Sequence, residues 1–341
     1  SAFTITPLRP SLASVCASSM ASALLPLAVG PAMSASGPRL SFSEIAFVLI
    51  ARVLAEPVPE QASLLELEAA LSDAGQPFAG ASMLDHCGDV LEIAIPSGTR
   101  EVVAPLVEQH LAPSAALFAD DVIAIPKLLV SDMDSTMIGQ ECIDELADFA
   151  GIKAQVAEIT ERAMRGELDF AGALTERVAL LEGLEESAIE RCLAERIVPT
   201  PGAATLIATL SAHGARCVLV TGGFHRFADP VAERLGFDRV VGNRLLIDGG
   251  KLSGEVQHPI CDSSTKERTL REETAELGSG ARTLAIGDGA NDTPMLVAAD
   301  YGIAYRAKPR TREAANGWVD GEDLTALLLL LGIERERWVM K

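Results

Sequence analysis

Four short aliphatic runs, each ended by small or polar residues, constrain the fold of this chain more than any other feature. They read "KLLVSD", "ARCVLVTGG", "ARTLAIGDG" and "DYGIAY" and fall between residues 127 and 305. Such runs are typical of strands that are buried on both faces of a parallel sheet. Segments with helical spacing separate them, such as "FADPVAERLG" and "STKERTLREETAELG". The alternation predicts a doubly wound, Rossmann-like α/β sheet over residues 126–341, with ligands at the carboxyl ends of its strands.

The first two of these strands are separated by a long insertion, at about residues 139–200, that has no strand pattern. Its apolar spacing predicts helices over residues 139–150, 153–165, 169–181 and 185–195. An insertion that follows the first strand lies over the carboxyl edge of the sheet, so we expect a helical cap that can close over a site there. A later stretch, "NRLLIDGGKLSGEV", predicts a hairpin that turns at Asp248-Gly249-Gly250.

The N-terminal part of the chain has a different pattern. Residues 41–125 alternate in the order strand, helix, strand, strand, helix, strand, from "EIAFVLIARV" to "ALFADDVIAI". This order predicts a separate ferredoxin-like α+β domain. Residues 1–40 are rich in Ser, Ala and Pro and have no acidic residue. They favour a disordered extension or a start placed too early, with a targeting peptide as the alternative.

Composition excludes several classes of partner. The formal net charge of -20 argues against nucleic acid, which requires clustered basic residues, although a single basic cleft could still bind a small anion. No apolar run reaches the roughly 18 residues of a membrane span, so we expect no membrane partner. The six cysteines form no CxxC pair or regular spacing, which favours reduced thiols and a cytoplasmic protein.

Polar residues end three of the predicted parallel strands. Asp132, Thr221 and Asp288 lie in "VSDMDST", "VLVTGGF" and "AIGDGAND". Each alone could be a turn or capping residue, but three on one sheet edge favour a site. Carboxylates without a histidine cluster suit Mg²⁺, and the backbone N–H groups of the "TGGF" turn could hold phosphate. Lys266, near the start of a helix, could neutralise further charge, or it could be an ordinary surface lysine.

The chain contains neither a P-loop nor a dinucleotide-binding fingerprint, so the site is interpreted as phosphate, Mg²⁺ and a carboxylate nucleophile. In the cap, Arg177 projects from the middle of an apolar stripe formed by Phe170, Leu174, Val178 and Leu181. It is either a structural arginine that snorkels from the core or a ligand for a substrate carboxylate.

The motifs "DMDST", "TGGF", Lys266 and "GDGANDTPM", in this order and with a helical insertion after the first, resemble the haloacid dehalogenase superfamily. Within that superfamily, "DMDSTMIGQECIDELADFAG" and "ITERAMRGELDFAGALTERVALL" are similar to the phosphoserine phosphatase family. The resemblance covers residues 126–304. On pattern alone, residues 41–125 resemble the ACT-like domain that many bacterial members carry.

The resemblance implies a reaction, which is the Mg²⁺-dependent hydrolysis of O-phospho-L-serine in the last step of serine biosynthesis. Asp132 would be the nucleophile and would form an aspartyl-phosphate. Asp134 would protonate the leaving oxygen and then deprotonate water, so the pKa values of these two carboxyl groups should diverge. The alternatives are transfer of the phosphate to homoserine and hydrolysis of another small phosphate ester.

The resemblance also implies the ligands of the metal and the phosphate. Mg²⁺ would be bound by Asp132, the backbone carbonyl of Asp134 and Asp288. Supporting residues would be Asn291 and Asp292, which would also hold the catalytic Lys266. Phosphate would be bound by Thr221, Gly222 and Gly223. Thr221 stands where this motif often has Ser, and it keeps the hydroxyl.

Substrate recognition would fall to the cap. The resemblance places Arg177 on the carboxylate of phosphoserine and Glu141 on its ammonium, with Met164 and Phe170 as apolar contacts. Without the resemblance, Glu141 would be interpreted as a solvated acid. Met164 and Phe170 would be interpreted as core residues. The N-terminal domain could serve as a homodimer interface, an amino-acid sensor or a plain scaffold.

Overall fold

The computed structural model describes residues 48–54, 57–84, 87–278 and 280–341, without the side chain of Met164. The predictions for residues 1–40 therefore lie outside the described residues. Contacts divide the chain into two compact units. One unit comprises residues 1–113 and 119–123, and the other comprises residues 114–118 and 124–341.

The described part of the first unit has five regular elements. These are β1 (Val48–Leu54), α2 (Gln61–Asp73), β2 (Gly80–Leu84), β3 (Cys87–Pro96) and α3 (Arg100–Leu111). The strands pair antiparallel in the order β2-β3-β1, and the helices bury aliphatic side chains such as Leu67 and Val107. The elements follow one another as expected for a ferredoxin-like domain, and the ACT-like assignment stays a prediction.

The last strand expected for the N-terminal domain is shorter than its apolar run suggested. It is β4 (Ala115–Ala119), and it pairs antiparallel with β12 (Gly317–Val319) of the second unit. Residues 114–118 accordingly belong with the second unit, whereas the sequence suggested a boundary at residue 125.

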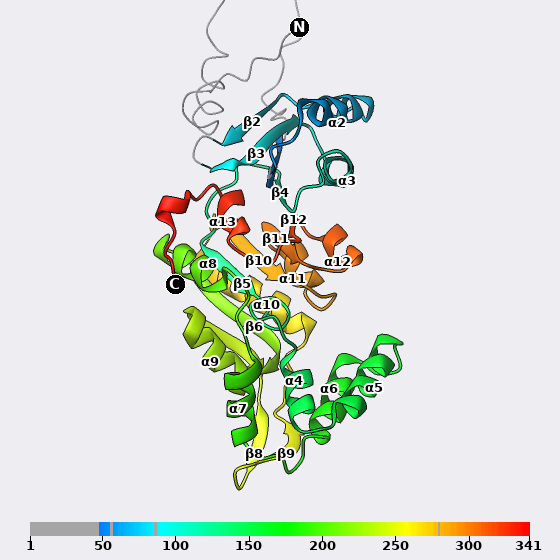
Figure 1. Ribbon diagram of the computed structural model, residues 1–341, viewed down its shortest axis with the longest axis vertical. Coiled ribbons are helices and arrows are strands. Elements are labelled where there is room, and N and C mark those ends of the chain that lie inside the picture. Colours follow the sequence, from blue (N-terminus) through cyan, green and yellow to red (C-terminus); the bar gives the residue numbers. More distant parts are fainter. Residues whose placement is uncertain (1–47, 55–56, 85–86, 279) are drawn as a thin grey trace, which may run out of the picture. The chain divides into compact units, whose positions relative to one another are not determined.

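The second unit is built on a mostly parallel sheet, which confirms the α/β fold class (Figure 1). The four predicted strands are β5 (Leu128–Ser131), β6 (Arg216–Phe224), β10 (Thr283–Gly287) and β11 (Tyr301–Tyr305). They pair in parallel in the order β11-β10-β5-β6. Two further strands were not predicted, namely β7 (Arg239–Asn243) beside β6 and β12 beside β11. β12 has only three residues and β7 is half-buried, so neither has the long apolar run of a central strand.

Helices pack against this sheet in two contacting pairs. One pair is α8 (Ala203–Ala212) and α9 (His225–Leu235), and the other is α10 (Ser263–Leu277) and α11 (Thr293–Ala298). Two short helices follow, α12 (Pro309–Ala314) and α13 (Ala326–Leu330). None of the helices in the described residues has the length and apolar character needed to cross a membrane.

The predicted cap is present as four helices. They are α4 (Cys142–Phe149), α5 (Lys153–Met164), α6 (Phe170–Ala179) and α7 (Ser187–Arg196). The start of α6 follows from its sequence, because the side chain of Asp169 accepts a hydrogen bond from the amide of Gly172 at 2.7 Å. This cap helix therefore begins with Phe170.

The predicted hairpin is formed by β8 (Leu245–Asp248) and β9 (Lys251–Val256). Its turn residues Gly249 and Gly250 have φ of 57° and 81°, the left-handed conformation that this turn type requires. The hairpin packs on the cap (Figure 1). The amide of Gly183 donates to the carbonyl of Leu252 at 2.8 Å, and the amide of Leu252 donates to the carbonyl of Leu184 at 2.9 Å.

Candidate active site

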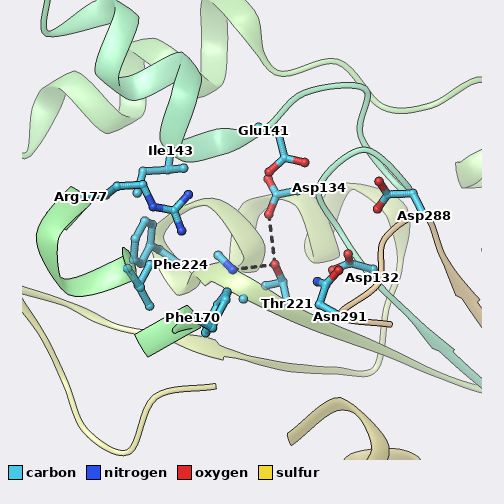
Figure 2. A pocket seen from close by; sticks show the side chains of 13 residues that line it. Asp132, Asp134, Glu141, Ile143, Phe170, Arg177, Thr221, Phe224, Asp288 and Asn291 are labelled. Atoms are coloured by element: carbon cyan, nitrogen blue, oxygen red, sulfur yellow. Dashed lines mark hydrogen bonds between the residues drawn. The ribbon is translucent and has the colours of Figure 1, made fainter. Parts of the chain in front are cut away.

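The polar strand ends singled out in the sequence lie in one pocket (Figure 2). Asp132 follows β5, Thr221 lies near the end of β6, and Asp288 follows β10. Because β10, β5 and β6 are neighbours in a parallel sheet, their carboxyl ends meet at one edge. The pocket is lined by Asp132, Asp134, Glu141, Ile143, Phe170, Leu174, Arg177, Thr221, Gly222, Gly223, Phe224, Asp288 and Asn291.

Asp132 is held firmly at one of its two carboxylate oxygens. The side chain is buried, and Oδ1 accepts a hydrogen bond from the amide of Met133 at 2.8 Å. The same oxygen forms an ion pair with Nζ of Lys266 at 2.7 Å. Within the described residues no hydrogen bond reaches Oδ2. Asp132 is therefore oriented by one oxygen while the other is available for chemistry.

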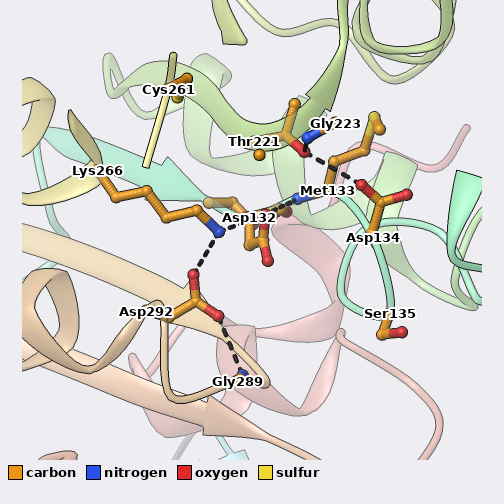
Figure 3. Close-up of polar contacts among 12 residues, drawn as sticks. Asp132, Met133, Asp134, Ser135, Thr221, Gly223, Cys261, Lys266, Gly289 and Asp292 are labelled. Carbon is orange, nitrogen blue, oxygen red and sulfur yellow. Dashed lines mark hydrogen bonds and ion pairs between the residues drawn. The ribbon is translucent and has the colours of Figure 1, made fainter. Parts of the chain in front are cut away.

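Lys266 is buried inside the site and is not a surface lysine (Figure 3). Its ammonium group lies between Asp132 and Asp292, with an Nζ to Oδ1 distance of 2.6 Å to Asp292. Burial alone would lower the pKa of Lys266, but the two carboxylates outweigh it and raise that pKa above its usual value. The other oxygen of Asp292 accepts a hydrogen bond from the amide of Gly289 at 3.0 Å. Asp292 therefore holds the ammonium group of Lys266 with one oxygen and the loop at Gly289 with the other.

Three carboxyl groups form a candidate metal site. Asp132, Asp288 and Asp292 each have a carboxylate oxygen that lies within 4.8 Å of the other two. Burial, followed by the charge of Asp292, raises the pKa of Asp132, against the opposing effect of Lys266. The same two causes raise the pKa of Asp288 to about 6. One ammonium group does not balance three crowded carboxylates, and hard oxygen ligands with surplus negative charge fit a divalent cation such as Mg²⁺.

Asp134 lies beside the predicted phosphate-binding turn. Its Oδ2 accepts a hydrogen bond from Oγ1 of Thr221 at 3.1 Å, and its Oδ1 accepts one from the amide of Cys142 at 2.8 Å. Burial raises the pKa of Asp134, opposed by the hydrogen bonds from Cys142 and Thr221. A raised pKa suits a group that carries a proton. Since burial raises the pKa of Asp132 as well, the divergence between the two carboxyl groups stays a prediction.

The "TGGF" turn is a bulge in β6. Val220 pairs with Val241 and Phe224 with Asn243, so four steps along β6 match two along β7. The extra residues project into the pocket, where the amide of Gly223 donates to Oγ1 of Thr221 at 2.8 Å.

Side chains approach both glycines of this bulge closely. A Cβ atom on Gly222 would lie 2.9 Å from Cζ of Phe170, and one on Gly223 would lie 2.8 Å from Oδ2 of Asp134. Phe170 of the cap therefore approaches the bulge at Gly222, and Asp134 approaches it at Gly223.

Two charged groups enter the pocket from the cap side (Figure 2). Nε of Arg177 donates a hydrogen bond to the carbonyl of Ala173 at 3.2 Å. Among the described residues, its guanidinium group forms no ion pair. Burial lowers the pKa of Arg177, against the nearby acids. Glu141 accepts a hydrogen bond from Oγ of Ser135 at 2.8 Å. Although much of the residue is exposed, desolvation of its carboxyl group, followed by the charge of Asp134, raises the pKa of Glu141 to about 7.

The structure thus brings most of the predicted site residues together. Asn291 and Phe170 also line the pocket, whereas the side chain of Met164 lies outside the described residues. Three apolar lining residues were missed as site residues, namely Ile143, Leu174 and Phe224. Leu174 belongs to the same stripe as Arg177, and Phe224 directly follows the two glycines, so both could have been proposed. Ile143 carries no such signal.

Comparisons with known proteins identify the family. Residues 129–297 match the family model of haloacid dehalogenase-like hydrolases. A phosphoserine phosphatase of Albidiferax ferrireducens is 46% identical over 210 residues, which are 60% of this chain and 89% of that protein. A phosphoserine phosphatase of Mycobacterium tuberculosis is 47% identical over 210 residues, which are 61% of this chain. The chain spans about half the length of the latter protein, at 51%.

Solved structures give the same assignment. A probable phosphoserine phosphatase from Vibrio cholerae, in unliganded form, matches with a TM-score of 0.65 and 30% identity, covering 85% of this chain and 88% of that chain. A phospho-aspartyl intermediate analogue of phosphoserine phosphatase matches with a TM-score of 0.55 and 37% identity, covering 60% and 97%. With Asp132 held beside a lysine at the carboxyl edge of the sheet, this chain belongs to the phosphoserine phosphatases among the haloacid dehalogenase-like hydrolases.

Proposed function

We propose that this enzyme hydrolyses O-phospho-L-serine to L-serine and phosphate, with Mg²⁺ as its cofactor. The observation that carries the proposal is the position of Asp132. It lies in a pocket that has a phosphate-binding bulge on one side and two unlike charges, Arg177 and Glu141, on the cap side. Phosphoserine carries a phosphate, a carboxylate and an ammonium group, and the pocket offers a partner for each of them.

In the first step, Asp132 would attack phosphorus through its free oxygen. A bond forms between that oxygen and phosphorus while the bond from phosphorus to the seryl oxygen breaks, which leaves an aspartyl-phosphate. Lys266 supports this step because it holds the other oxygen of Asp132 at 2.7 Å. The hydroxyl of Thr221 and the amides of the bulge would bind the phosphate oxygens.

Asp134 would handle the proton in both halves of the reaction. Its raised pKa allows it to carry a proton for the departing seryl oxygen. The carboxylate that remains would then take a proton from the water that hydrolyses the aspartyl-phosphate. The hydrogen bond from the amide of Cys142 would keep Asp134 in place through both steps.

The residues that would hold Mg²⁺ are Asp132, Asp288 and the backbone carbonyl of Asp134, with Asn291 and Asp292 in support. When bound, the ion supplies positive charge that offsets the crowded carboxylates and the phosphate oxygens. Asp292 has both oxygens engaged by Lys266 and Gly289, which favours a supporting position.

The cap would select the substrate. Arg177 has a guanidinium that is free of ion pairs among the described residues, and its planar fork fits a carboxylate. Glu141 would bind the ammonium group, with its carboxyl already oriented by Ser135. Phe170 would cover the phosphate end of the substrate through its contact with Gly222.

We also propose that the enzyme is cytoplasmic and forms a homodimer through its N-terminal part. Five cysteines in the described residues are free and buried, which suits a reducing compartment. Among the described strands, β2 lies at the edge of its sheet, and an edge strand can pair with another chain.

The direct test measures phosphate release from O-phospho-L-serine with and without Mg²⁺. We expect turnover that requires the ion and falls by about 10³-fold or more in Asp132→Asn, because this change removes the nucleophile. Asp300→Asn is a matched control, since Asp300 is a carboxylate outside the pocket that binds Thr283. Near-normal turnover by Asp132→Asn would refute the assignment of the nucleophile.

A further inference from the structure

One buried side chain outside the pocket contacts both the bulge of β6 and the segment that leads into α10. Asn243 ends β7 and is 2% exposed. Its Nδ2 donates a hydrogen bond to the carbonyl of Gly222 at 2.8 Å and approaches the carbonyl of Cys261 at 3.3 Å. Its Oδ1 accepts a hydrogen bond from the amide of Cys261 at 2.7 Å. The side chain thus contacts the bulge of β6 and the segment that leads into α10.

The contact with Gly222 controls a peptide group that faces the pocket. The carbonyl of Gly222 and the amide of Gly223 belong to one planar peptide unit, so fixing one end orients the other. Asn243 holds the carbonyl end, and Oγ1 of Thr221 accepts from the amide end at 2.8 Å. Between two glycines the backbone is otherwise free to rotate. The side chain of Asn243 removes that freedom.

The contact with Cys261 fixes the start of the helix that carries Lys266. The amide and carbonyl of Cys261 both bind the Asn243 side chain, and the next residue, Asp262, caps α10 by accepting from the amide of Thr265 at 3.0 Å. Lys266 lies in the first turn of that helix and reaches Asp132 (Figure 3). The same side chain therefore relates the bulge to the helix that carries the ammonium group.

Close packing of β7 against the bulge supports this role. A Cβ atom on Gly242 would lie 3.2 Å from Cγ2 of Thr221 and 3.3 Å from the carbonyl oxygen of Gly223. The end of β7 thus lies directly behind the phosphate-binding turn, although none of its residues lines the pocket.

We propose that Asn243 is a positioning residue of the phosphatase reaction, which fixes the orientation of the Gly222–Gly223 peptide in the bulge and the distance of the bulge from Lys266. The inference rests on the proposed role of the bulge in phosphate binding. Because phosphate is common to all substrates of the site, loss of Asn243 should affect phosphoserine and simpler phosphate esters equally. This distinguishes Asn243 from Arg177 and Glu141, which would act on the serine part.

The test uses Asn243→Ala and the isosteric Asn243→Asp in the full chain with Mg²⁺. Both should weaken binding of inorganic phosphate, measured by calorimetry, by about tenfold or more, with a matching loss in kcat/KM. Asn316→Ala is the matched control, because Oδ1 of Asn316 also accepts a backbone amide, that of Gly302 at 2.9 Å, away from the pocket. The control should bind phosphate as the wild type does.

The pH dependence of Asn243→Asp distinguishes positioning of the Gly222 carbonyl from a merely structural role. A carboxylate at this position repels the carbonyl of Gly222, whereas a protonated carboxyl can donate to it. The activity of Asn243→Asp relative to wild type should therefore rise as the pH falls, while that of Asn243→Ala stays level, with circular dichroism confirming the folded state at each pH.

Folded variants that bind phosphate as tightly as the wild type and keep kcat/KM within about twofold would overturn the proposal. A relative activity of Asn243→Asp that does not change with pH would do the same. Failure of the proposed function gives a different result, because the wild type would then release no phosphate from phosphoserine. Calorimetry of inorganic phosphate would still measure the effect of Asn243 in that case.

Discussion

At the scale of single residues, Arg177 has an environment that suits a group for binding substrate. It comes from a cap helix, carries a charge that is free of ion pairs among the described residues, and sits among apolar neighbours such as Leu174. A desolvated cation of this kind is costly unless a ligand compensates it. The carboxylate of a substrate would provide that compensation.

Replacing Arg177 should therefore change substrate choice more than chemistry. We expect Arg177→Ala to raise KM for phosphoserine by about tenfold to a hundredfold, because a charge-assisted bidentate contact is lost. A phosphate ester without a carboxylate should be affected much less. The control Arg226→Ala removes an arginine of α9 that pairs with Glu186 outside the pocket. Equal losses on both substrates would contradict the assignment.

Glu141 should make substrate preference depend on pH. Its pKa is raised to about 7, so the carboxyl group is charged above that pH and becomes neutral as the pH falls through it. Attraction for the substrate ammonium is then lost. We expect the ratio of kcat/KM for phosphoserine to that for an ester without an ammonium group to fall below about pH 7. The ratio cancels groups that act on both substrates.

The matched variant is Glu141→Gln, which keeps the shape of the side chain and does not titrate. Its ratio should be low and constant between about pH 6 and 8. A wild-type ratio that stays level over the same range would exclude the role of Glu141 in binding the ammonium group.

At the scale of elements, α6 of the cap touches the bulge of β6 through Phe170. Phe170, at the start of α6, packs against Gly222 so closely that a Cβ atom there would lie 2.9 Å from its ring. A side chain at residue 222 would therefore displace the ring of Phe170. The hairpin of β8 and β9 holds the other end of α6 through backbone pairing at Gly183 and Leu184.

Gly222→Ala should push α6 away from the bulge. We expect kcat/KM for phosphoserine to fall by about tenfold, because the added methyl group meets an aromatic ring that packs against it. The double variant Gly222→Ala with Phe170→Leu should recover part of the loss, since the smaller side chain makes room. Steady-state kinetics of the single and double variants provides the check. No recovery in the double variant would place the defect in the bulge itself.

At the scale of the whole molecule, the sequence position of β4 differs from the unit to which it belongs. Although the strand follows the N-terminal elements in sequence, it pairs with β12, and residues 114–118 belong to the unit that contains the pocket. A boundary drawn from the sequence at residue 125 would remove this strand from its partner.

Two fragments test this point. Residues 114–341 should fold and keep phosphatase activity close to that of the full chain, because every residue lining the pocket lies within them. Residues 126–341 expose β12 as an edge and bury less apolar surface, so their melting temperature should be lower by several degrees. Equal melting temperatures for the two fragments would show that β4 contributes nothing to this unit.

The sequence by itself predicted the features that depend on residues close to one another in the chain. Asp132, Thr221 and Asp288 were recognised because each follows a short apolar run, and the four cap helices and the turn at Gly249 and Gly250 likewise carry local patterns. A parallel sheet brings its strand ends together whatever the loops do, so the position of the site followed from those patterns.

Only the tertiary structure decided the contacts between distant segments. The pairing of β7 with β6 sets the bulge at Gly222 and Gly223, and Asn243 ties it to Cys261. From its residue type alone, Lys266 could be a surface lysine, and only the family resemblance implied a catalytic role; the tertiary structure buries it between Asp132 and Asp292. A hydrogen bond or ion pair between residues far apart in the chain depends on packing, and it leaves no periodicity or spacing that the sequence could show.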